Sequence, residues 1–349
     1  MPNESDCRLM EKIATSLFLR SVLIITSVLC VICLPSCIYC IWRIQKSVKL
    51  HFNSKFVIIT HNLFVLVHCI ARIILHGKDL WNYFSSWSSG CAIIPSRTRC
   101  ELRVIYKFTE YVVQISPLIL TMERCMATFH VRGYEDRYRW CGIIFNVCHI
   151  FIALIFMYIQ ASSKNDEVMI YYCRLINTRD MIPMHLPTLV IFFSQFVTIP
   201  WLLFLLRKNE KYRNAALHNH CSLTEKYQIY ENLRTSSMFR VFCASTWIYV
   251  TFSAGSSYFT ILLLEKMPLS DQFAILEINQ SLPIYFIILS ILILRVDKKP
   301  RDEFKVQVHS YEKHYFTELQ KFFDDAFDNI NLKKNMNRVI PLQNTKIHE

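Results

Sequence analysis

The chain has 349 residues, of which 53% are hydrophobic, and its formal net charge is +12. This apolar content is too high for a soluble domain of ordinary design, and the 5 Gly residues argue against a Gly-rich phosphate loop. The positive charge could indicate nucleic acid, but it is placed between long apolar runs, which favours membrane lipids and no nucleic acid.

Seven apolar runs follow one another between Ser21 and Leu294, and four of them contain no charged residue. A bilayer core about 30 Å thick is crossed by roughly 20 helical residues. The runs therefore predict an all-α fold, a seven-transmembrane helix bundle that forms one receptor domain over residues 21–294. The expected spans are 21–42, 56–74, 100–124, 140–161, 186–206, 241–264 and 272–294.

Residues 1–20 are expected to form an extracellular N-terminus. They are mostly polar and lack a small-residue cleavage site, so the first span is expected to act as an uncleaved signal anchor. Asn3-Glu4-Ser5 is an acceptor sequence for glycosylation at Asn3, which fits an external position.

The distribution of Lys and Arg predicts the orientation of the bundle. The segments after the first, third and fifth spans hold 15 of these residues, and those after the second, fourth and sixth hold 7. The tail after Leu294 adds 11. Because positive residues favour the cytoplasm, we expect the N-terminus outside and the C-terminus inside.

Charged residues interrupt the second, third and seventh spans, which are therefore expected to line a polar cavity. Arg72 lies two residues from the end of its span and is expected to snorkel to the lipid headgroups. Lys107 and Glu110 are three residues apart, so they can pair along one helix face or contact a ligand. Glu277 has the same alternatives, a hydrogen bond to a neighbouring helix or ligand contact.

Four of the 14 cysteines are expected on the outside, where disulfides form: Cys7, Cys91, Cys100 and Cys173. Four cysteines permit three pairings. We favour Cys100–Cys173, which would tie the second external loop over the mouth of the bundle, with Cys7–Cys91 as the complement. The spacing does not fit a zinc site, and we expect no metal and no cofactor.

The inner end of the third span carries Met122-Glu123-Arg124-Cys125. An Arg at this depth can be held by its neighbouring Glu or by an adjacent helix in one state and released toward a partner in another, as a switch requires. The alternative is an ion pair that only marks the membrane boundary.

Residues 295–349 are expected to form a cytoplasmic tail. Apolar residues recur at helical spacing over about 311–330, with charged residues between them, which predicts an amphipathic helix on the membrane or on a partner.

Several features together resemble a G-protein-coupled receptor: seven helices, Cys100 opening the third, Cys173 in the second external loop, and Glu123-Arg124 at the third helix's inner end. The pair is similar to the Asp/Glu-Arg-Tyr motif of these receptors, with Cys125 in place of the aromatic residue. The sequence departs from the rhodopsin class, because no Pro lies near Trp247 and because 282–285 only loosely matches the Asn-Pro-x-x-Tyr motif.

A narrower resemblance is to the nematode serpentine chemoreceptors of the alpha, beta and alpha-beta superfamily, over roughly residues 5–300. It rests on four stretches: 50–55 entering the second span, Cys91 and Cys100 followed by Arg103, residues 122–128, and Tyr134-Glu135. It implies a chemosensory receptor in the plasma membrane of sensory neurons, with a small environmental ligand and a heterotrimeric G protein as partners.

The function expected from these observations is reception of a small ligand in the outer half of the bundle, without enzymatic activity. Candidate ligand contacts, chosen by depth and polarity, are Lys107, Glu110, Gln114, Trp247, Tyr249 and Glu277. The alternative is a seven-span transporter or ligand-gated channel. Transporters often have inverted repeats and helices broken by Gly or Pro, and the sequence indicates neither.

Overall fold

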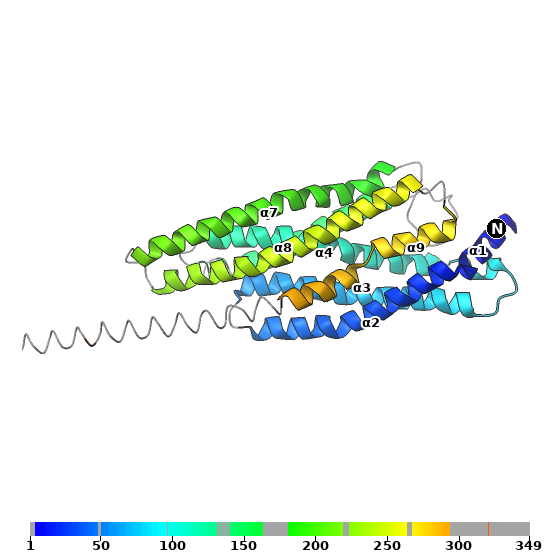
Figure 1. Cartoon of the computed structure of the whole chain (residues 1–349), viewed down its shortest axis with the longest axis horizontal. Coiled ribbons are helices and arrows are strands. Elements are labelled where there is room, and N and C mark those ends of the chain that lie inside the picture. Colours follow the sequence, from blue (N-terminus) through cyan, green and yellow to red (C-terminus); the bar gives the residue numbers. More distant parts are fainter. Residues whose placement is uncertain are drawn as a thin grey trace, which may run out of the picture. The chain divides into compact units, whose positions relative to one another are not determined.

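The structure is a computed structural model that describes residues 4–47, 50–95, 97–130, 134, 138, 140–162, 181–218, 223–263, 267–293 and 320. All regular structure in these residues is helical, which confirms the all-α prediction. The compact unit that contains the helices is Met1–Ile293. Figure 1 shows its long helices lying side by side along one direction.

Seven helical segments correspond in order to the expected spans. The first six are α2 (Leu17–Lys46), α3 (Phe52–Phe84), α4 (Arg97–Phe129), α6 (Cys141–Ser162), α7 (Met181–His218) and α8 (Leu223–Leu263). The seventh segment consists of α9 (Leu269–Asn279) and a further helical stretch, 282–293. Five of the seven are long and apolar enough to cross a membrane, while α4 and α8 have the length but are more polar.

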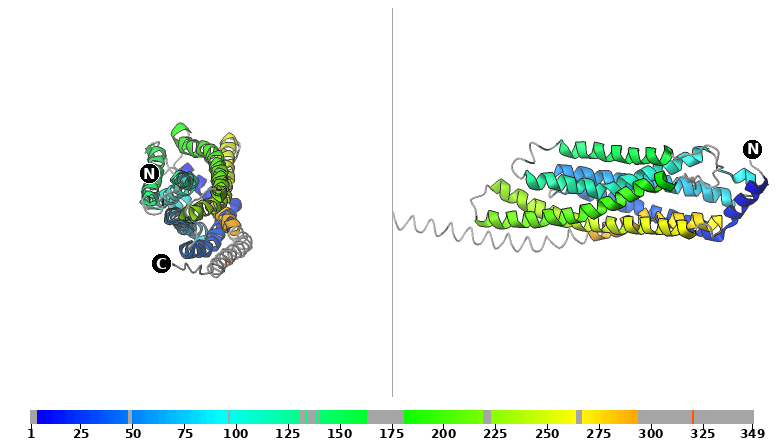
Figure 2. Two further views of the ribbon diagram at one scale, coloured as in Figure 1. Left: turned by 90° about the vertical axis from the view of Figure 1, so that its left-hand side faces the viewer. Right: turned by 90° about the horizontal axis from the view of Figure 1, so that it is seen from above.

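The polar α4 occupies the middle of the bundle, where it contacts α3, α6, α7 and α8. The end view in Figure 2 shows the helices gathered around one another. Large apolar side chains on α2, α6 and α7 remain exposed, among them Ile25, Phe151 and Phe193. An apolar exterior around a polar interior is the arrangement that lipid favours.

We name the two ends of the bundle by what they carry. The α1 end contains α1 (Glu4–Thr15) and η1 (Gly90–Ile93), and the Arg124 end contains Glu123 and Arg124. At the α1 end, Cys7 and Cys91 form a disulfide. Met10, Ile13 and Ala14 of α1 pack in one apolar cluster with residues of α2 and α9. The N-terminal segment is therefore a folded cap on this end of the bundle.

The seventh span is broken, in contrast to the single helix over 272–294 that the sequence predicts. α9 ends at Asn279, and a new helical stretch begins at residue 282 and contains Pro283. Pro283 favours a helix start because it has no N–H to donate and its φ is already helical. The expectation that the chain has no Pro-interrupted helix was therefore wrong.

Except for α6, which matches its expected span to within one residue, the other helices extend beyond the expected spans. α3 continues ten residues past position 74, to Phe84, and α8 begins at Leu223 instead of 241. Polar residues that the sequence analysis placed in loops, such as Asp79 and Asn232, consequently lie on packed helices and are buried.

Close packing between α6 and α3 depends on Gly142. A Cβ atom at this position would lie 2.7 Å from Asn53 Oδ1 and 2.8 Å from Asn53 Cα. We expect Gly142→Ala to lower the free energy of unfolding by roughly 1–3 kcal/mol, the usual cost of overpacking. Thermal unfolding of the purified protein in detergent measures this loss.

Gly255→Ala is the matched control, because nothing lies within 4 Å of a Cβ atom at Gly255. Equal melting temperatures for the two variants would contradict the close approach of α6 to α3.

Candidate functional site

Arg124 is the centre of a buried polar network at the Arg124 end. Its side chain is 1% exposed, and that of Glu123 is fully buried. The guanidinium donates from Nε to Glu123 Oε2 at 2.6 Å and from Nη2 to Glu123 Oε1 at 2.5 Å. This two-point pairing fixes the plane of the guanidinium as well as its position.

The same guanidinium links α4 to two other helices. Nη2 donates to Ser54 Oγ on α3 at 2.6 Å, and Nη1 donates to Asn232 Oδ1 on α8 at 3.2 Å. Ser54 Oγ in turn donates to Glu123 Oε2 at 3.0 Å. The second group of Asn232, Nδ2, donates to the carbonyl of Ala127 at 3.0 Å. Arg124 and Asn232 together therefore clamp α8 against α4.

The segment after α4 is joined to the network through Tyr134. Its hydroxyl donates to Glu123 Oε1 at 2.7 Å and accepts from Asn53 Nδ2 at 3.0 Å. Burial, and then the nearby Glu123 carboxylate, raise the pKa of the Tyr134 hydroxyl. The hydroxyl therefore stays protonated at neutral pH, as its role as a donor to Glu123 requires.

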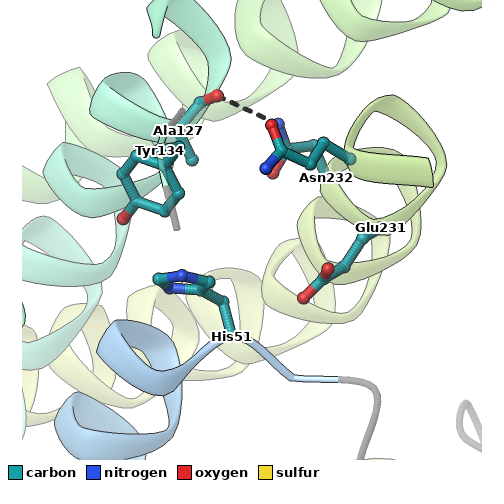
Figure 3. A pocket seen from close by; sticks show the side chains of 6 residues that line it. His51, Ala127, Tyr134, Glu231 and Asn232 are labelled. Carbon is teal, nitrogen blue, oxygen red and sulfur yellow. Dashed lines mark hydrogen bonds between the residues drawn. The ribbon is translucent and has the colours of Figure 1, made fainter. Parts of the chain in front are cut away.

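A small cavity lies beside this network, lined by His51, Ala127, Tyr134, Gln228, Glu231 and Asn232. Figure 3 shows His51 and Tyr134 on one side of it and Glu231 and Asn232 of α8 on the other. Its volume is about 10 Å³, enough for about one water molecule. A larger group could enter only if the elements that line the cavity moved apart.

A second polar cluster lies on α4 in the interior of the bundle and contains four of the six predicted ligand contacts. Glu110 accepts from Lys107 Nζ at 2.8 Å, from Gln114 Nε2 at 3.1 Å and from the Tyr249 hydroxyl at 3.4 Å. The pairing of Lys107 with Glu110 along one helix face is thus present. Glu110 joins α4 to α8 through Tyr249.

Tyr249 extends this cluster to the seventh span. Its ring stacks on that of Tyr285 with 4.9 Å between centroids, and the Tyr285 hydroxyl lies 2.7 Å from Thr246 Oγ1. Trp247 lies elsewhere. Its ring is perpendicular to that of Phe196 on α7, with 6.0 Å between the ring centroids. Residues two apart on a helix point about 200° apart, so Tyr249 and Trp247 cannot share one site.

A third cluster surrounds Glu277 of α9, nearer the α1 end. Arg72 Nη2 donates to Glu277 Oε2 at 2.7 Å, Arg103 pairs with Glu277 Oε1, and His76 Nε2 lies 3.3 Å from Oε2. Arg72 also donates to the backbone carbonyls of Glu277 and Gln280. These carbonyls lie where the seventh span is broken, so Arg72 satisfies backbone groups that the break leaves without helical partners.

Arg72 therefore does not reach the headgroups, and the prediction that it snorkels was wrong. Its side chain is fully buried, because α3 continues well past it toward the α1 end. Glu277 does bond to neighbouring helices, α3 and α4, which was one of its two predicted alternatives.

Several predicted positions fall outside what the structure describes. These are Asn3, Cys173, the side chain of Cys100 and, apart from residue 320, the tail helix at 311–330. The structure also identifies Ser54 and Asn232, which the sequence analysis did not select. Ser54 stands in the stretch 50–55 that carried the family resemblance, whereas Asn232 lies in an expected loop and had no distinguishing signal.

Comparison with known proteins gives a family match over most of the chain. Residues 4–331 match the family described as serpentine type 7TM GPCR receptor class ab chemoreceptor. The chain is also similar to serpentine receptor class alpha-39 of Caenorhabditis elegans, with 24% identity over 202 residues. That match covers 55% of this chain and 51% of the relative, so the chain spans about half the length of the curated relative it matches.

Arg72 provides a test of the buried charge cluster. Arg72→Gln removes one cation from Glu277 and the donors to the broken seventh span, so we expect a loss of roughly 3 kcal/mol in unfolding free energy. Lys78→Gln, an exposed position on the same helix, serves as the control. If Arg72 instead reached the headgroups, the two variants would melt at the same temperature.

Proposed function

Because the chain belongs to the serpentine 7TM G-protein-coupled receptors of chemoreceptor class ab, we propose that it detects a small environmental ligand and activates a heterotrimeric G protein. As a member of this receptor family it is a multi-pass membrane protein and not an enzyme. We place the ligand toward the α1 end and the G protein at the Arg124 end. The surplus of Lys and Arg in the odd-numbered segments and the tail supports the Arg124 end as cytoplasmic.

The observation that carries this proposal is the arrangement around Arg124. A fully buried cation is held by Glu123 of its own helix, by Ser54 of α3 and by Asn232 of α8. Only the bonds to Ser54 and Asn232 depend on how the helices pack. A shift of α8 would break the bond to Asn232 and leave the pair with Glu123 intact, so Arg124 can adopt two arrangements without losing its countercharge.

The structure represents the closed arrangement in this proposal. The cavity between α8 and the Tyr134 segment has a volume of about 10 Å³, which is too small for a peptide of a partner. Activation would then require α8 to move outward from α4. Such a movement would open the cavity and expose Arg124 to the G protein.

The cluster around Glu110 is well placed to control that movement. Glu110 holds Tyr249 of α8, and Tyr249 stacks on Tyr285 of the seventh span. A ligand that bonded to Lys107, Glu110 or Gln114 would compete with Tyr249 for the carboxylate. The ligand would thus act on α8, the helix that Arg124 and Asn232 clamp at the other end.

The transporter alternative gains one observation, the break in the seventh span. In transporters, unwound carbonyls of broken helices coordinate ions. Here the carbonyls of Glu277 and Gln280 accept from Arg72, a resident cation, so they are already occupied. The break therefore gives weaker support to transport than the Arg124 network gives to signalling.

Substitution of Arg124 tests the proposal directly. In cells that carry a G-protein activation reporter and are challenged with a library of small volatile and water-soluble compounds, we expect Arg124→Ala to abolish signalling that the unchanged chain supports. The double variant Glu123→Gln/Arg124→Ala removes both charges and guards against misfolding caused by an unpaired buried carboxylate.

Arg207→Ala, an exposed position on α7, is the control and should signal normally. Surface labelling must show equal amounts of each variant. A ligand-evoked current that persists in Arg124→Ala, without any G-protein signal, would contradict the receptor proposal and favour a channel.

Asn232 tests the clamp on α8. Asn232→Leu removes the bonds to Arg124 and to the Ala127 carbonyl and keeps a similar side-chain volume. A loss of about 1–2 kcal/mol from the closed arrangement would raise the open population roughly five- to thirtyfold.

We therefore expect higher G-protein activity without ligand in Asn232→Leu, measured with the same reporter at matched surface expression. Arg240→Ala, an exposed position two turns further along α8, should leave this basal activity unchanged. Unchanged or lower basal activity in Asn232→Leu would contradict the clamp.

A further inference from the structure

A cluster of buried charges lies at the α1 end. Among the described residues it contains the arginines Arg72, Arg99 and Arg103 and the acids Asp79 and Glu277. Glu277 pairs with Arg72 and Arg103, and Asp79 pairs with Arg99 through Arg99 Nη2. Arg99 Nε and Nη1 are buried and have no hydrogen-bond partner in the described part of the chain.

Buried guanidinium donors without acceptors are costly, because removing a charge from water is repaid only by an opposite charge or by full hydrogen bonding. An anionic group that reached Arg99 would satisfy these donors. Such a group needs a route to Arg99.

A cleft leads to the outermost member of this cluster. It has a volume of about 560 Å³ and lies where the end of α3, the η1 segment and the start of α4 meet. Arg99 forms part of its wall, together with Lys78, Trp81 and Asn82 of α3 and Ile94 and Pro95 of the loop. The volume lies within the range of pockets that hold small organic molecules, roughly 300–1,000 Å³.

The chemistry of the cleft is that of an anion site. Lys78 is an exposed cation one residue from Asp79, and Arg99 provides a second cation whose side chain is 7% exposed. The Asn82 amide can donate a hydrogen bond, and the Trp81 ring, 77% exposed, offers an apolar face to a carbon chain. No acidic residue lines this cleft in the described part of the chain.

We propose that this cleft binds a small organic molecule through a single anionic group, a carboxylate or a phosphate, held between Lys78 and Arg99. None of the residues of the Glu110 cluster lines this cleft, so the inference is a second binding site and goes beyond the proposed function. The anion accepts from the Arg99 donors that have no partner in the described part of the chain. The carbon chain of the ligand lies along Trp81.

Quenching of tryptophan fluorescence tests the proposal on the purified full-length protein, without a G protein. The probe is 6-bromohexanoate, whose bromine quenches a nearby indole, and 6-bromohexanol is its neutral counterpart. We expect saturable quenching by the carboxylate only. The quenched fraction should disappear in Trp81→Phe, which identifies Trp81 among the 6 tryptophans.

Charge variants complete the test. Lys78→Gln should raise the half-saturation concentration of 6-bromohexanoate roughly three- to tenfold, as expected for the loss of one partly exposed charge contact. Lys12→Gln, an exposed lysine of α1 outside the cleft, should have no effect. Equal quenching by the alcohol, or equal affinity in Lys78→Gln, would overturn the proposal.

Two further experiments distinguish a free anion from a lipid headgroup. Competition by inorganic phosphate supports a free anion, and weaker probe binding in nanodiscs that contain phosphatidylglycerol, compared with phosphatidylcholine alone, supports a lipid headgroup. Failure of the proposed function is distinguishable, because the binding assay needs no signalling. A protein that binds the probe but activates no G protein would support this inference and contradict only the receptor proposal.

Discussion

The cost of burying arginine in an apolar bundle constrains the whole structure. Arg72 and Arg124 are both essentially inaccessible, and each requires a carboxylate and further acceptors at fixed positions. Arg124 obtains its carboxylate from the adjacent residue, whereas Arg72 obtains Glu277 from α9. The Arg124–Glu123 pair lies on one helix and persists when helices move. The Arg72–Glu277 pair joins two helices and breaks if they separate. In the proposed function, this difference makes the α1 end stable and the Arg124 end adjustable.

The three polar clusters share one face of α4. Arg103, Glu110 and Arg124 are separated by multiples of seven residues, and Pro117 occupies the remaining position of the same row. Seven residues are close to two helical turns, so these side chains lie along one stripe. Any rotation of α4 about its axis would disturb all three clusters at once. α4 therefore couples the two ends of the bundle.

The sequence predicted the helical class and the polar character of the second, third and seventh spans, because apolar length and charge position are local properties. It did not predict where individual polar side chains point, because that depends on how the helices pack. Arg72 is about 18 Å from the end of α3, and a span assumed to end at residue 74 made it look superficial. Asn232, the partner of Arg124 on α8, was not predicted for the same reason, since it was assigned to a loop.

Among the points where a described helix lacks a regular hydrogen bond, which include Pro35, Pro187 and Pro200, two receive side-chain donors from neighbouring helices: the surroundings of Pro117 in α4 and the break in the seventh span. Pro117 cannot donate to the Val113 carbonyl. On either side of that carbonyl, Gln195 Nε2 of α7 donates to the Gln114 carbonyl at 3.1 Å, and His149 Nε2 of α6 lies 2.6 Å from the Val112 carbonyl. At the break in the seventh span, Arg72 has the same role. Since lipid offers no replacement donors, α4 and the seventh span can bend only where a neighbouring side chain moves with them. How far each helix can bend at these points therefore depends on the neighbouring helix.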